Sequence, residues 1–572
     1  MRIERLPFTA ESVQAWTEPG GRHHNWPVVY ALNDARAVYV GETLNAAGRM
    51  RQHLDNPEKR QLRSLRVVLD DTFNKSVCLD LESYLIRLFA GDGQYKVLNR
   101  NDGITDSDYY DRSRYRELFA EIFEQLRADE LFAQSIEQIE NSDLFKLSPF
   151  KALNHDQESA IVDILEGLFE DLENDAPNRV VIQGGPGTGK TIVAIYMMKL
   201  LQDIANTEPS DDASTDSVFA DFFVEGHREL LEGFRVGLVV PQQSLRKSIK
   251  NVFKRVPGLS PAMVMSPFDV VKAERKFDLL VVDEAHRLAQ YGAQPAPAVT
   301  KRFREINEGL ALPGEDWMRL TQLDWVRRKS RQQLLFIDRE QSIRPMDLPP
   351  AVVNEVCSRA ARESRSYTLR SQMRVAAGGD YITYVKEVLS DHPPAQARAF
   401  SSYDLRFFDD LGAMRREIFE RESEAGLARL LAGYGWKWRS KTEPDVPDIV
   451  LDGLELFWNR ADTDWINSRT SLEEVGSIHT VQGYDLNYAG VIIGPELYWD
   501  RAARAIRLDR KQYADTKGKS NNTVLGVTTT DDDVVALVRN IYRVLLTRGM
   551  KGTYVYVVDP ALREQMRPYF GG

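Results

Sequence analysis

The sequence predicts an α/β protein in which a small domain, with an antiparallel sheet and helices, precedes two larger domains with parallel sheets. Three observations support this fold class. A glycine-rich loop, residues 183–191, joins an apolar β-branched run to a helical stretch. Further short apolar runs alternate with helical stretches through the second half of the chain, as in parallel α/β folds. Near the N-terminus a short polar turn separates two β-type runs, which is typical of an antiparallel hairpin.

The length and the cysteine content limit the possible classes of protein. A chain of 572 residues is too long for one core. Cys78 and Cys357 are far apart and in no metal-ligand spacing, so we expect neither a zinc site nor a disulfide framework, and we expect a cytoplasmic protein. The first residues lack the apolar core of a signal peptide, and no run of about 18 apolar residues could span a bilayer.

Charge is distributed unevenly along the chain. The net charge is −11, but residues 203–232 hold nine acids against one base, and residues 49–66 hold six bases against two acids. Basic footprints on nucleic-acid-binding proteins are local, so the overall sign does not exclude nucleic acid. We expect the acidic segment 203–232 to be a solvated insertion; a mask over a basic groove is the alternative.

Residues 1–104 are expected to form the small domain. If Asp34 and Ala35 form a two-residue hairpin turn, Tyr30 lies directly opposite Tyr39. A helix is predicted to begin near Ala46. The other segments of the domain are the β-type runs 26–32 and 37–41, a strand at 65–69, a helix at 76–90 and the end segment 97–99.

This domain contains several polar residues that could take part in catalysis. Arg49 and His53 share one helix face because they are four residues apart. The sequence resembles the GIY-YIG nuclease family over residues 25–102, with Val28-Val29-Tyr30 in place of Gly-Ile-Tyr and a good match at Tyr39-Val40-Gly41. The other matching positions, in the family's order, are Arg49, His53, Glu82 and Asn99.

The resemblance implies phosphodiester cleavage. Glu82 is the one acid of the set, so it is the expected ligand of a single Mg²⁺ or Mn²⁺, and Arg49 is expected to hold the scissile phosphate. Tyr30, Tyr39 or His53 would take the proton of the nucleophile, and the sequence does not choose among them. The alternative is a degraded module that binds nucleic acid without cutting it. Residues 105–150 are expected to be a helical connector.

The glycine-rich loop fits the phosphate-binding template of Gly184, four residues, then Gly189-Lys190-Thr191. Its backbone N–H groups and the following helix N-terminus would bind phosphates, Lys190 would reach the β- and γ-phosphates, and Thr191 would hold Mg²⁺. Gln157, about 30 residues earlier, is expected to read adenine, which favours ATP over GTP. The loop residues expected to contact the nucleotide are Gly184, Gly185, Pro186, Gly187, Thr188, Gly189, Lys190 and Thr191.

Two acids follow the apolar strand 277–282. Asp283 is placed to hold Mg²⁺ and Glu284 to orient and deprotonate the attacking water. A later strand, 333–337, ends in Asp338, and Gln341 beyond it could sense the γ-phosphate. The first parallel-sheet domain is predicted over residues 151–355. Within it, the tryptophans of residues 287–332 are expected to pack in a subdomain, with nucleic-acid contact as the alternative.

The second parallel-sheet domain is predicted over residues 356–572, where Arg374 and Arg548 could reach the γ-phosphate from a facing domain. Asp485, in a polar loop with Gly483, could meet a ribose hydroxyl. The predicted strands are 368–372, 405–408, 449–450, 476–479, 491–493 and 552–558.

The ordered motifs of residues 150–560 resemble a superfamily 1 helicase, most closely the Schlafen group-3-type helicase domain family. This resemblance implies two RecA-like folds with ATP between them, and a nucleic-acid strand near residues 241–245, Gln341 and the loop 479–485. The chain has no insertions like the long arms of large processive helicases, so strand separation is less firmly implied than translocation.

The combined expectation is an ATP-dependent nucleic-acid motor fused to a metal-dependent endonuclease, using ATP and Mg²⁺ or Mn²⁺, with DNA favoured over RNA and no membrane association. The expected setting is DNA restriction, repair or phage defence. The alternatives are an ATP-gated nuclease that does not unwind, a motor with a non-cleaving N-terminal domain, and a nucleotide-dependent scaffold.

Overall fold

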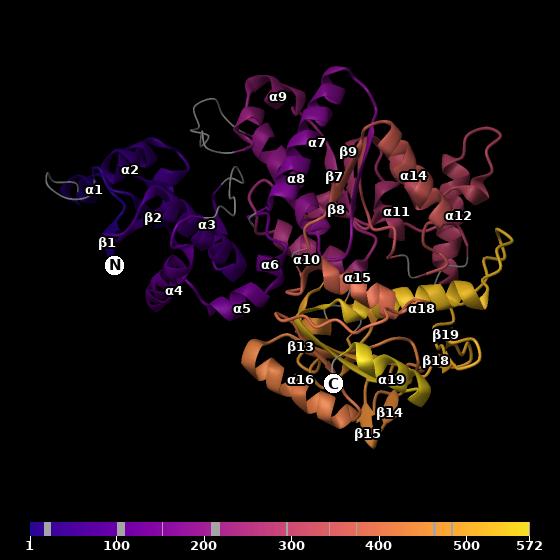
Figure 1. The fold of residues 1–572 in the computed structure, drawn as a ribbon. Coiled ribbons are helices and arrows are strands. Elements are labelled where there is room, and N and C mark those ends of the chain that lie inside the picture. The colour runs from indigo at the N-terminus through magenta and orange to yellow at the C-terminus, as the bar shows by residue number, and fades with distance from the viewer. Residues whose placement is uncertain are drawn as a thin grey trace. The chain divides into compact units, whose positions relative to one another are not determined.

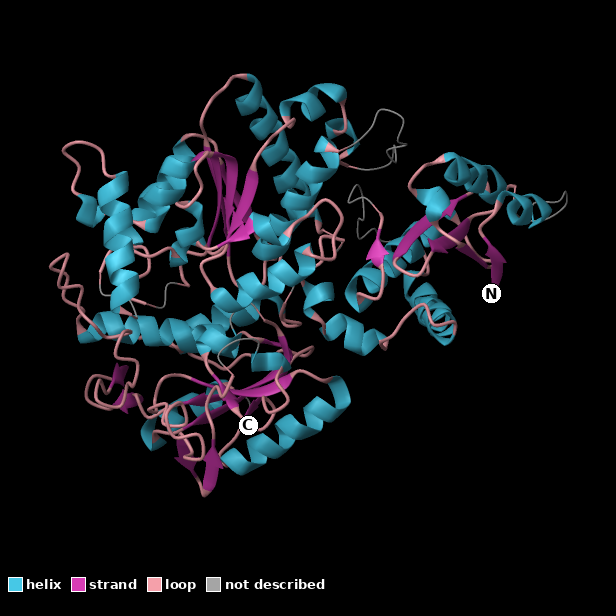
Figure 2. Cartoon of the chain, turned by 180° about the vertical axis from the view of Figure 1, so that it is seen from behind, coloured by secondary structure: helices cyan, strands magenta, loops and turns pink. Residues whose placement is uncertain are grey.

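The computed structural model describes residues 1–16, 24–99, 109–150, 153–206, 218–292, 296–341, 344–372, 374–461, 465–481 and 484–570. Within them the chain forms two compact units. The first comprises Met1–Asp175, Thr191–Gly233 and Ser248–Met263, and the second comprises Ala176–Lys190, Phe234–Lys247 and Val264–Gly572. Figure 1 colours the chain by residue number, and Figure 2 colours it by secondary structure. No helix in these described ranges is both long and apolar enough to cross a membrane.

A five-stranded sheet in the order β1-β4-β2-β3-β5 forms the centre of the N-terminal domain. Its pairs are antiparallel except β3 with β5, which is parallel. The strands are β1 (Arg2–Pro7), β2 (Val28–Asn33), β3 (Ala37–Thr43), β4 (Ser64–Leu69) and β5 (Lys96–Val97). The predicted fold class of this domain is confirmed, and the edge strand β1 is an addition to it.

The hairpin of β2 and β3 corrects one prediction. Tyr30 pairs with Gly41, and Tyr39 pairs with Leu32, so the two tyrosines are not direct cross-strand partners. The reason is the turn, which is centred on Ala35 and Arg36 and so lies one residue later than predicted. The Asp34 N–H donates to the Ala37 carbonyl at 3.0 Å, and the Asp34 carboxylate accepts two backbone N–H groups at 2.7 Å. The pairing therefore shifts by two residues, which leaves each side chain on its predicted face of the sheet.

Helices pack beside this sheet and continue into the predicted connector. Asp80 on α3 binds the guanidinium groups of Arg112 and Arg116, and it accepts a hydrogen bond from the Tyr109 hydroxyl. The connector helices α4, α5 and α6 all contact α3, so they extend the N-terminal domain. The helices that lie wholly in the first unit are α1 (Ala10–Trp16), α2 (Ala46–Asp55), α3 (Lys75–Asp92), α4 (Arg112–Ala128), α5 (Ile136–Asn141), α6 (Asp143–Lys146), α7 (His155–Glu173) and α9 (Glu225–Leu230). Two more helices, α8 (Lys190–Ala205) and α10 (Gln243–Phe253), contain residues of both units.

The second unit contains a six-stranded parallel sheet in the order β11-β6-β10-β9-β7-β8. Its strands are β6 (Arg179–Gly184), β7 (Val236–Val239), β8 (Val264–Met265), β9 (Phe277–Val282), β10 (Ser330–Ile337) and β11 (Ser366–Leu369). The central strands are buried apolar runs, as expected of a sheet covered on both faces. The strand β11 is expected with the second parallel sheet, but it pairs with β6 and so belongs to this first sheet.

A second parallel sheet in the same unit has the order β12-β20-β17-β13-β16. Its strands are β12 (Asp404–Phe407), β13 (Ala428–Ala432), β16 (Val475–Gly476), β17 (Leu486–Ile493) and β20 (Gly549–Val557). In Figure 1, α16 (Leu411–Ala425) lies along this sheet, and it contacts β13, β17 and β20. The predicted pair of parallel-sheet α/β folds is therefore confirmed.

One strand prediction in this half is corrected, and another strand is confirmed outside the main sheet. The segment predicted as a strand at 476–479 is β16 followed by the short helix α17 (Ile478–Val481). The strand predicted at 449–450 forms a separate antiparallel pair, β14 (Ile449–Leu451) with β15 (Leu454–Leu456). A second such pair is β18 (Leu497–Asp500) with β19 (Ala505–Leu508). The remaining helices of the unit are α11 (Pro267–Val270), α12 (Pro297–Leu310), α13 (Gln322–Lys329), α14 (Pro350–Arg362), α15 (Gly378–Val388), α18 (Asp531–Leu546) and α19 (Pro560–Met566).

The tryptophan-bearing segment between β9 and β10 is a packed subdomain, as predicted. Trp325 is fully buried, and its indole N–H donates to the Asn307 side chain at 2.6 Å. Trp317 packs edge-on against Tyr291 with ring centroids 5.2 Å apart. These side chains belong to one aromatic cluster with Phe303.

Candidate nucleotide and nuclease sites

Strand pairing in the first parallel sheet brings three predicted segments to one edge. The neighbouring strands β6, β10 and β9 end at Gly184, Ile337 and Val282. The phosphate loop, Asp338 and Asp283 therefore emerge side by side from the carboxyl ends of parallel strands, where α/β sheets bind ligands.

The loop backbone has the conformation that a phosphate cradle needs. Gly187 and Gly189 adopt φ values of +77° and +78°, which disfavour side chains. A Cβ on Gly184 would lie 2.5 Å from the Thr188 hydroxyl oxygen, whereas a Cβ on Gly185 would meet nothing within 4 Å. The Thr188 hydroxyl also donates to the Gly185 carbonyl at 3.0 Å. The loop is closed on its inner side and open at Gly185.

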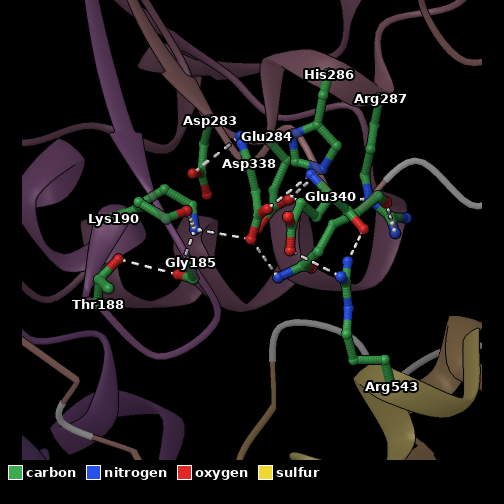
Figure 3. Close-up of polar contacts among 12 residues, drawn as sticks. Gly185, Thr188, Lys190, Asp283, Glu284, His286, Arg287, Asp338, Glu340 and Arg543 are labelled. Atoms are coloured by element: carbon green, nitrogen blue, oxygen red, sulfur yellow. Dashed lines mark hydrogen bonds and ion pairs between the residues drawn. The ribbon is translucent and has the colours of Figure 1, made fainter. Parts of the chain in front are cut away.

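Lys190 lies between the Gly185 carbonyl and the Asp338 carboxylate, as Figure 3 shows. Its ammonium donates to the carbonyl oxygens of Gly184 and Gly185 at 2.8 and 2.9 Å, and it is 3.7 Å from the Asp338 carboxylate. The Lys190 side chain is only 6% exposed. A buried ammonium held by two carbonyls and one carboxylate is already aimed at the loop where phosphates would bind.

The acids after β9 are both held in place. Asp283 is fully buried and accepts the Glu284 N–H at 3.0 Å. Glu284 adopts φ +50°, an unusual conformation for a residue with a side chain and one that accumulates at active sites. Burial raises the pKa of Glu284, but the His286 imidazole, 3.0 Å away, and Lys190 outweigh burial and hold that pKa below its usual value. Glu284 is therefore ionised at neutral pH and can orient a water molecule.

Gln341 connects to the same network. Its side-chain amide donates to Asp338 at 2.7 Å, and Gln341 is 3% exposed. The Arg287 guanidinium donates to the Gln341 carbonyl at 3.4 Å and lies 3.8 Å from Glu284. The predicted sensor, the phosphate-loop lysine and the predicted general base thus share neighbours.

Arg374 lies against the phosphate loop. A Cβ added to Gly187 would be 2.7 Å from the Arg374 Cβ. The Arg374 guanidinium donates to the Asp485 carboxylate, which is the residue expected to meet a ribose hydroxyl. Arg374 is predicted to approach from the facing sheet, but it approaches from the first sheet, because the preceding strand β11 pairs with β6. Val375, the next residue, packs in the core of the second sheet.

Arg548 does come from the second sheet. It precedes β20, is 3% exposed, and donates from Nη1 to the Tyr484 carbonyl at 3.1 Å. Its Nε has no hydrogen-bond partner among the described residues. Burial and the neighbouring Arg374 lower the pKa of Arg548 to about 9, so it remains a cation at neutral pH. Lys190, Arg374 and Arg548 form a cationic set that suits a polyphosphate.

The segments expected near a nucleic-acid strand also meet. Gln242, just before α10, donates to the His479 carbonyl at 3.4 Å. The Arg344 guanidinium is 2.5 Å from His479 Nε2. Burial and Arg344 lower the pKa of His479 well below its ordinary value, so its imidazole is neutral and accepts from Arg344.

The nucleotide contacts predicted for Gln157, Thr191 and Gly483 stay predictions. Gln157 is buried and completes a capping box, in which its side-chain oxygen accepts the Asn154 N–H at 3.1 Å. Thr191 follows Lys190 in α8 and belongs to the other compact unit. Gly483 lies outside the described residues.

In the N-terminal domain, Tyr30, His53 and Tyr39 form a cluster. The Tyr30 hydroxyl is 2.7 Å from His53 Nε2, and both residues are buried. Burial and Tyr39 raise the pKa of Tyr30 well above its ordinary value, while burial, Lys59 and Arg49 lower the pKa of His53 to about 2. The neutral phenol therefore donates to a neutral imidazole. Tyr39 meets His53 edge-on with centroids 5.2 Å apart.

Arg49 and Glu82 border this cluster. Arg49 donates a side-chain hydrogen bond to Tyr30, and the charge of Glu82 is close enough to raise the pKa of Tyr30. Asn99 has a different position, since its side-chain amide donates to the Val40 carbonyl at 2.7 Å and accepts the Val40 N–H at 3.0 Å. The structure thus gathers the predicted tyrosines, Arg49, His53 and Glu82, while Asn99 binds the backbone of β3.

In the described ranges, no three His, Cys, Asp or Glu side chains lie close enough together to hold a metal ion. Mg²⁺ needs no such cluster, since it commonly uses one or two carboxylates together with water and substrate phosphates. The buried carboxylate of Asp283 and the half-buried Glu82 fit that donor set.

Sequence reasoning missed two polar side chains at the nucleotide edge. Arg543 on α18 donates to the Glu340 carboxylate at 2.8 Å and also to the Glu340 carbonyl. Both lie next to predicted motif residues, Glu340 before Gln341 and Arg543 five residues before Arg548. Their pairing has no sequence signal because it depends on how the two sheets pack.

Comparisons with known proteins agree with this geometry. Residues 177–559 match the family described as Schlafen group 3, DNA/RNA helicase domain. An uncharacterized protein of Saccharomyces cerevisiae, YPL245W, is 27% identical over 421 residues, covering 68% of this chain and 84% of that protein. The ATP-dependent DNA helicase RecG of Aquifex aeolicus is 31% identical over 147 residues, 24% of this chain and 17% of its own length.

Proposed function

The chain belongs to the Schlafen group 3 DNA/RNA helicase domain family, and on that premise we propose that it is an ATP-driven motor on nucleic acid with a metal-dependent nuclease at its N-terminus. The family supplies a helicase-like ATPase domain that binds ATP, Mg²⁺ and nucleic acid. The proposal adds the roles of individual residues, the coupling to cleavage and a preference for DNA.

One observation carries the ATPase part. The second sheet contributes a buried arginine, Arg548, whose neighbours include Arg374 and Glu284 at the phosphate edge of the first sheet. Lys190 would hold the β- and γ-phosphates, Arg374 and Arg548 would balance the charge that develops on the γ-phosphate, and Glu284 would orient the attacking water. Asp283 and Thr191 would hold Mg²⁺, which when bound shields the phosphate charges.

Movement along nucleic acid would use the contact of Gln242 with His479. Gln242 lies between strand β7 of the first sheet and helix α10, and His479 lies in α17 beside the second sheet. A change in the separation of the two sheets would alter this contact, which is how ATP-driven closure could move a bound strand. The similarity to a DNA helicase over 147 residues favours DNA as the track.

The nuclease part rests on the cluster around Tyr30. Arg49 would hold the scissile phosphate, and Glu82 would hold Mg²⁺ or Mn²⁺, which when bound stabilises negative charge on the phosphate. The Tyr30 hydroxyl is oriented by its hydrogen bond to the neutral His53 imidazole, and the adjacent Arg49 guanidinium opposes the rise in its pKa that burial causes. We assign Tyr30 as the group that exchanges a proton with the nucleophile, with His53 as its partner.

A motor and a nuclease on one chain increase the effective concentration of cleavable bonds near the nuclease. This architecture suits DNA restriction, repair or defence against phage, and that setting is part of the proposal. A second candidate is an ATP-gated nuclease that does not separate strands, which the lack of long inserted arms favours.

The test is a side-by-side assay of ATP hydrolysis and cleavage on single-stranded, duplex and forked DNA and RNA. Lys190→Ala should abolish hydrolysis, and Glu82→Ala should abolish cleavage while sparing hydrolysis. Lys272→Ala and Glu11→Ala remove an exposed lysine and an exposed acid outside both sites, and should match wild type. Hydrolysis by Lys190→Ala would refute the phosphate site.

The same assay separates the alternatives. Hydrolysis and cutting without strand displacement would support the ATP-gated nuclease. If wild type hydrolyses ATP but cuts no substrate with Mg²⁺ or Mn²⁺, the N-terminal domain binds without cleaving. If neither DNA nor RNA changes the rate of hydrolysis, the chain is a nucleotide-dependent scaffold.

A further inference from the structure

Arg543 forms an ion pair that joins the two parallel sheets. It lies in the last turn of α18, beside the second sheet, and only 6% of it is exposed. Its guanidinium donates to the carboxylate of Glu340 at 2.8 Å and to the Glu340 carbonyl. Glu340 follows β10 of the first sheet, so the Arg543 side chain forms two hydrogen bonds between the elements of the second sheet and those of the first (Figure 3).

The Glu340 end of this pair continues into the phosphate site. The Glu340 N–H donates to one oxygen of Asp338 at 3.0 Å, and the Gln341 amide donates to the other at 2.7 Å. The Asp338 carboxylate in turn lies 3.7 Å from the Lys190 ammonium. A continuous polar path therefore runs from α18 to the phosphate loop.

The Arg543 end leads to Arg548. The Thr547 hydroxyl donates to the Arg543 carbonyl at 2.9 Å, and the Arg548 N–H donates to the Leu545 carbonyl at 3.2 Å. These bonds extend the helical geometry of α18 to the start of β20, so the place of Arg543 fixes the place of Arg548.

Other ion pairs nearby lack these properties. Lys386 also binds Glu340, but both side chains are about half exposed, and such pairs contribute little. Arg539, one turn earlier on α18, pairs with Asp391, which follows α15 in the core of the same second sheet. Arg539 therefore provides a matched control on the same helix.

From this geometry we propose that Arg543 is a positioning residue for ATP hydrolysis, which through Glu340 sets the register of Arg548 against Lys190. This inference rests on the proposed ATPase function. Neither Arg543 nor Glu340 needs to touch the nucleotide. Loss of the pair leaves the loop and its lysine intact, so ATP binding is retained while the rate of the chemical step falls.

The experiment measures kcat and KM for ATP in Glu340→Arg, Arg543→Glu and the double swap that carries both changes. Each single variant should lose about 5- to 50-fold in kcat with KM for ATP within about threefold of wild type, and the swap should recover most of the loss. Arg539→Glu and Lys386→Ala should retain the wild-type kcat.

The result that would overturn the inference is a wild-type kcat in Glu340→Gln and in both charge reversals. Glu340 is half exposed, so Glu340→Gln should fold even if Arg543→Glu does not. Equal losses in the single variants and the swap would also overturn it, because they indicate damage to folding and not a lost pair. If wild type turns over no faster than Lys190→Ala, the ATPase proposal itself fails, and the two failures are distinguishable.

Discussion

At the scale of single residues, the nucleotide site depends on backbone geometry that the sequence motif indicates well. Gly187 and Gly189 occupy the left-handed region, as a loop that folds around phosphate requires. The contact of Gly187 with Arg374 could not be predicted. It depends on the pairing of β11, the strand before Arg374, with β6.

Gly187→Ala should reduce ATP hydrolysis by about tenfold or more. The added methyl group would lie 2.7 Å from the Arg374 Cβ, at a φ of +77° that alanine disfavours. Steady-state hydrolysis measures the loss. Gly309→Ala in α12 is the control, because its Cβ meets nothing within 4 Å; it should keep full activity and stabilise the fold by up to about 1 kcal/mol. Unchanged turnover in Gly187→Ala would contradict the contact.

His53 makes the N-terminal domain sensitive to acid. Its pKa falls from 6.5 to about 2 in the folded protein, so below pH 6.5 the unfolded chain binds more protons than the folded one. The stability is complete above pH 6.5 and declines as the pH falls toward 2. Between pH 7.5 and pH 5, wild type should lose about 2 kcal/mol more than His53→Gln in denaturant unfolding. Parallel pH profiles for the two proteins would disprove this, and His392→Gln, an exposed histidine, should follow wild type.

At the scale of elements, strands and helices with a strong hydrophobic pattern are predicted well. The strand 277–282 before Asp283 and the helix α2 after its Asn45 cap are confirmed. The predicted β2–β3 register is wrong by two residues because the turn, which the Asp34 side chain caps, lies one residue later than predicted. The 476–479 strand is right only at Gly476, which ends β16, because helix α17 begins at Ile478, and such short elements follow tertiary contacts more than propensity.

Asn99 shows how a side chain can extend a strand. β5 ends at Val97, and the Asn99 amide then takes the place of a backbone by binding both the N–H and the carbonyl of Val40. Asn99→Ala should destabilise the domain by about 1–3 kcal/mol, because two buried backbone groups lose their partner. Chemical denaturation checks this, with the exposed Gln94→Ala as a control of small effect. A loss of cleavage with no loss of stability would instead place Asn99 in the chemistry.

At the scale of the whole molecule, the two parallel sheets of the second unit contribute opposite ends of their strands to the nucleotide edge. The first sheet presents the carboxyl ends of β6, β9 and β10, while Asp485 and Arg548 directly precede β17 and β20 of the second. The order of motifs predicts both folds. It does not predict that β11 joins the first sheet or that Arg543 binds Glu340, because sheet pairing and long-range ion pairs have no local signal.

The central claim is that Arg548 completes an ATP site built on Lys190. The most direct measurement is ATP turnover by wild type and Arg548→Ala, with and without single-stranded DNA, alongside the affinity for ATP. We predict that DNA accelerates the wild type, and that Arg548→Ala lowers kcat by about 1000-fold while the affinity for ATP changes only a few-fold. Wild-type turnover by Arg548→Ala, with the same response to DNA, would contradict the account.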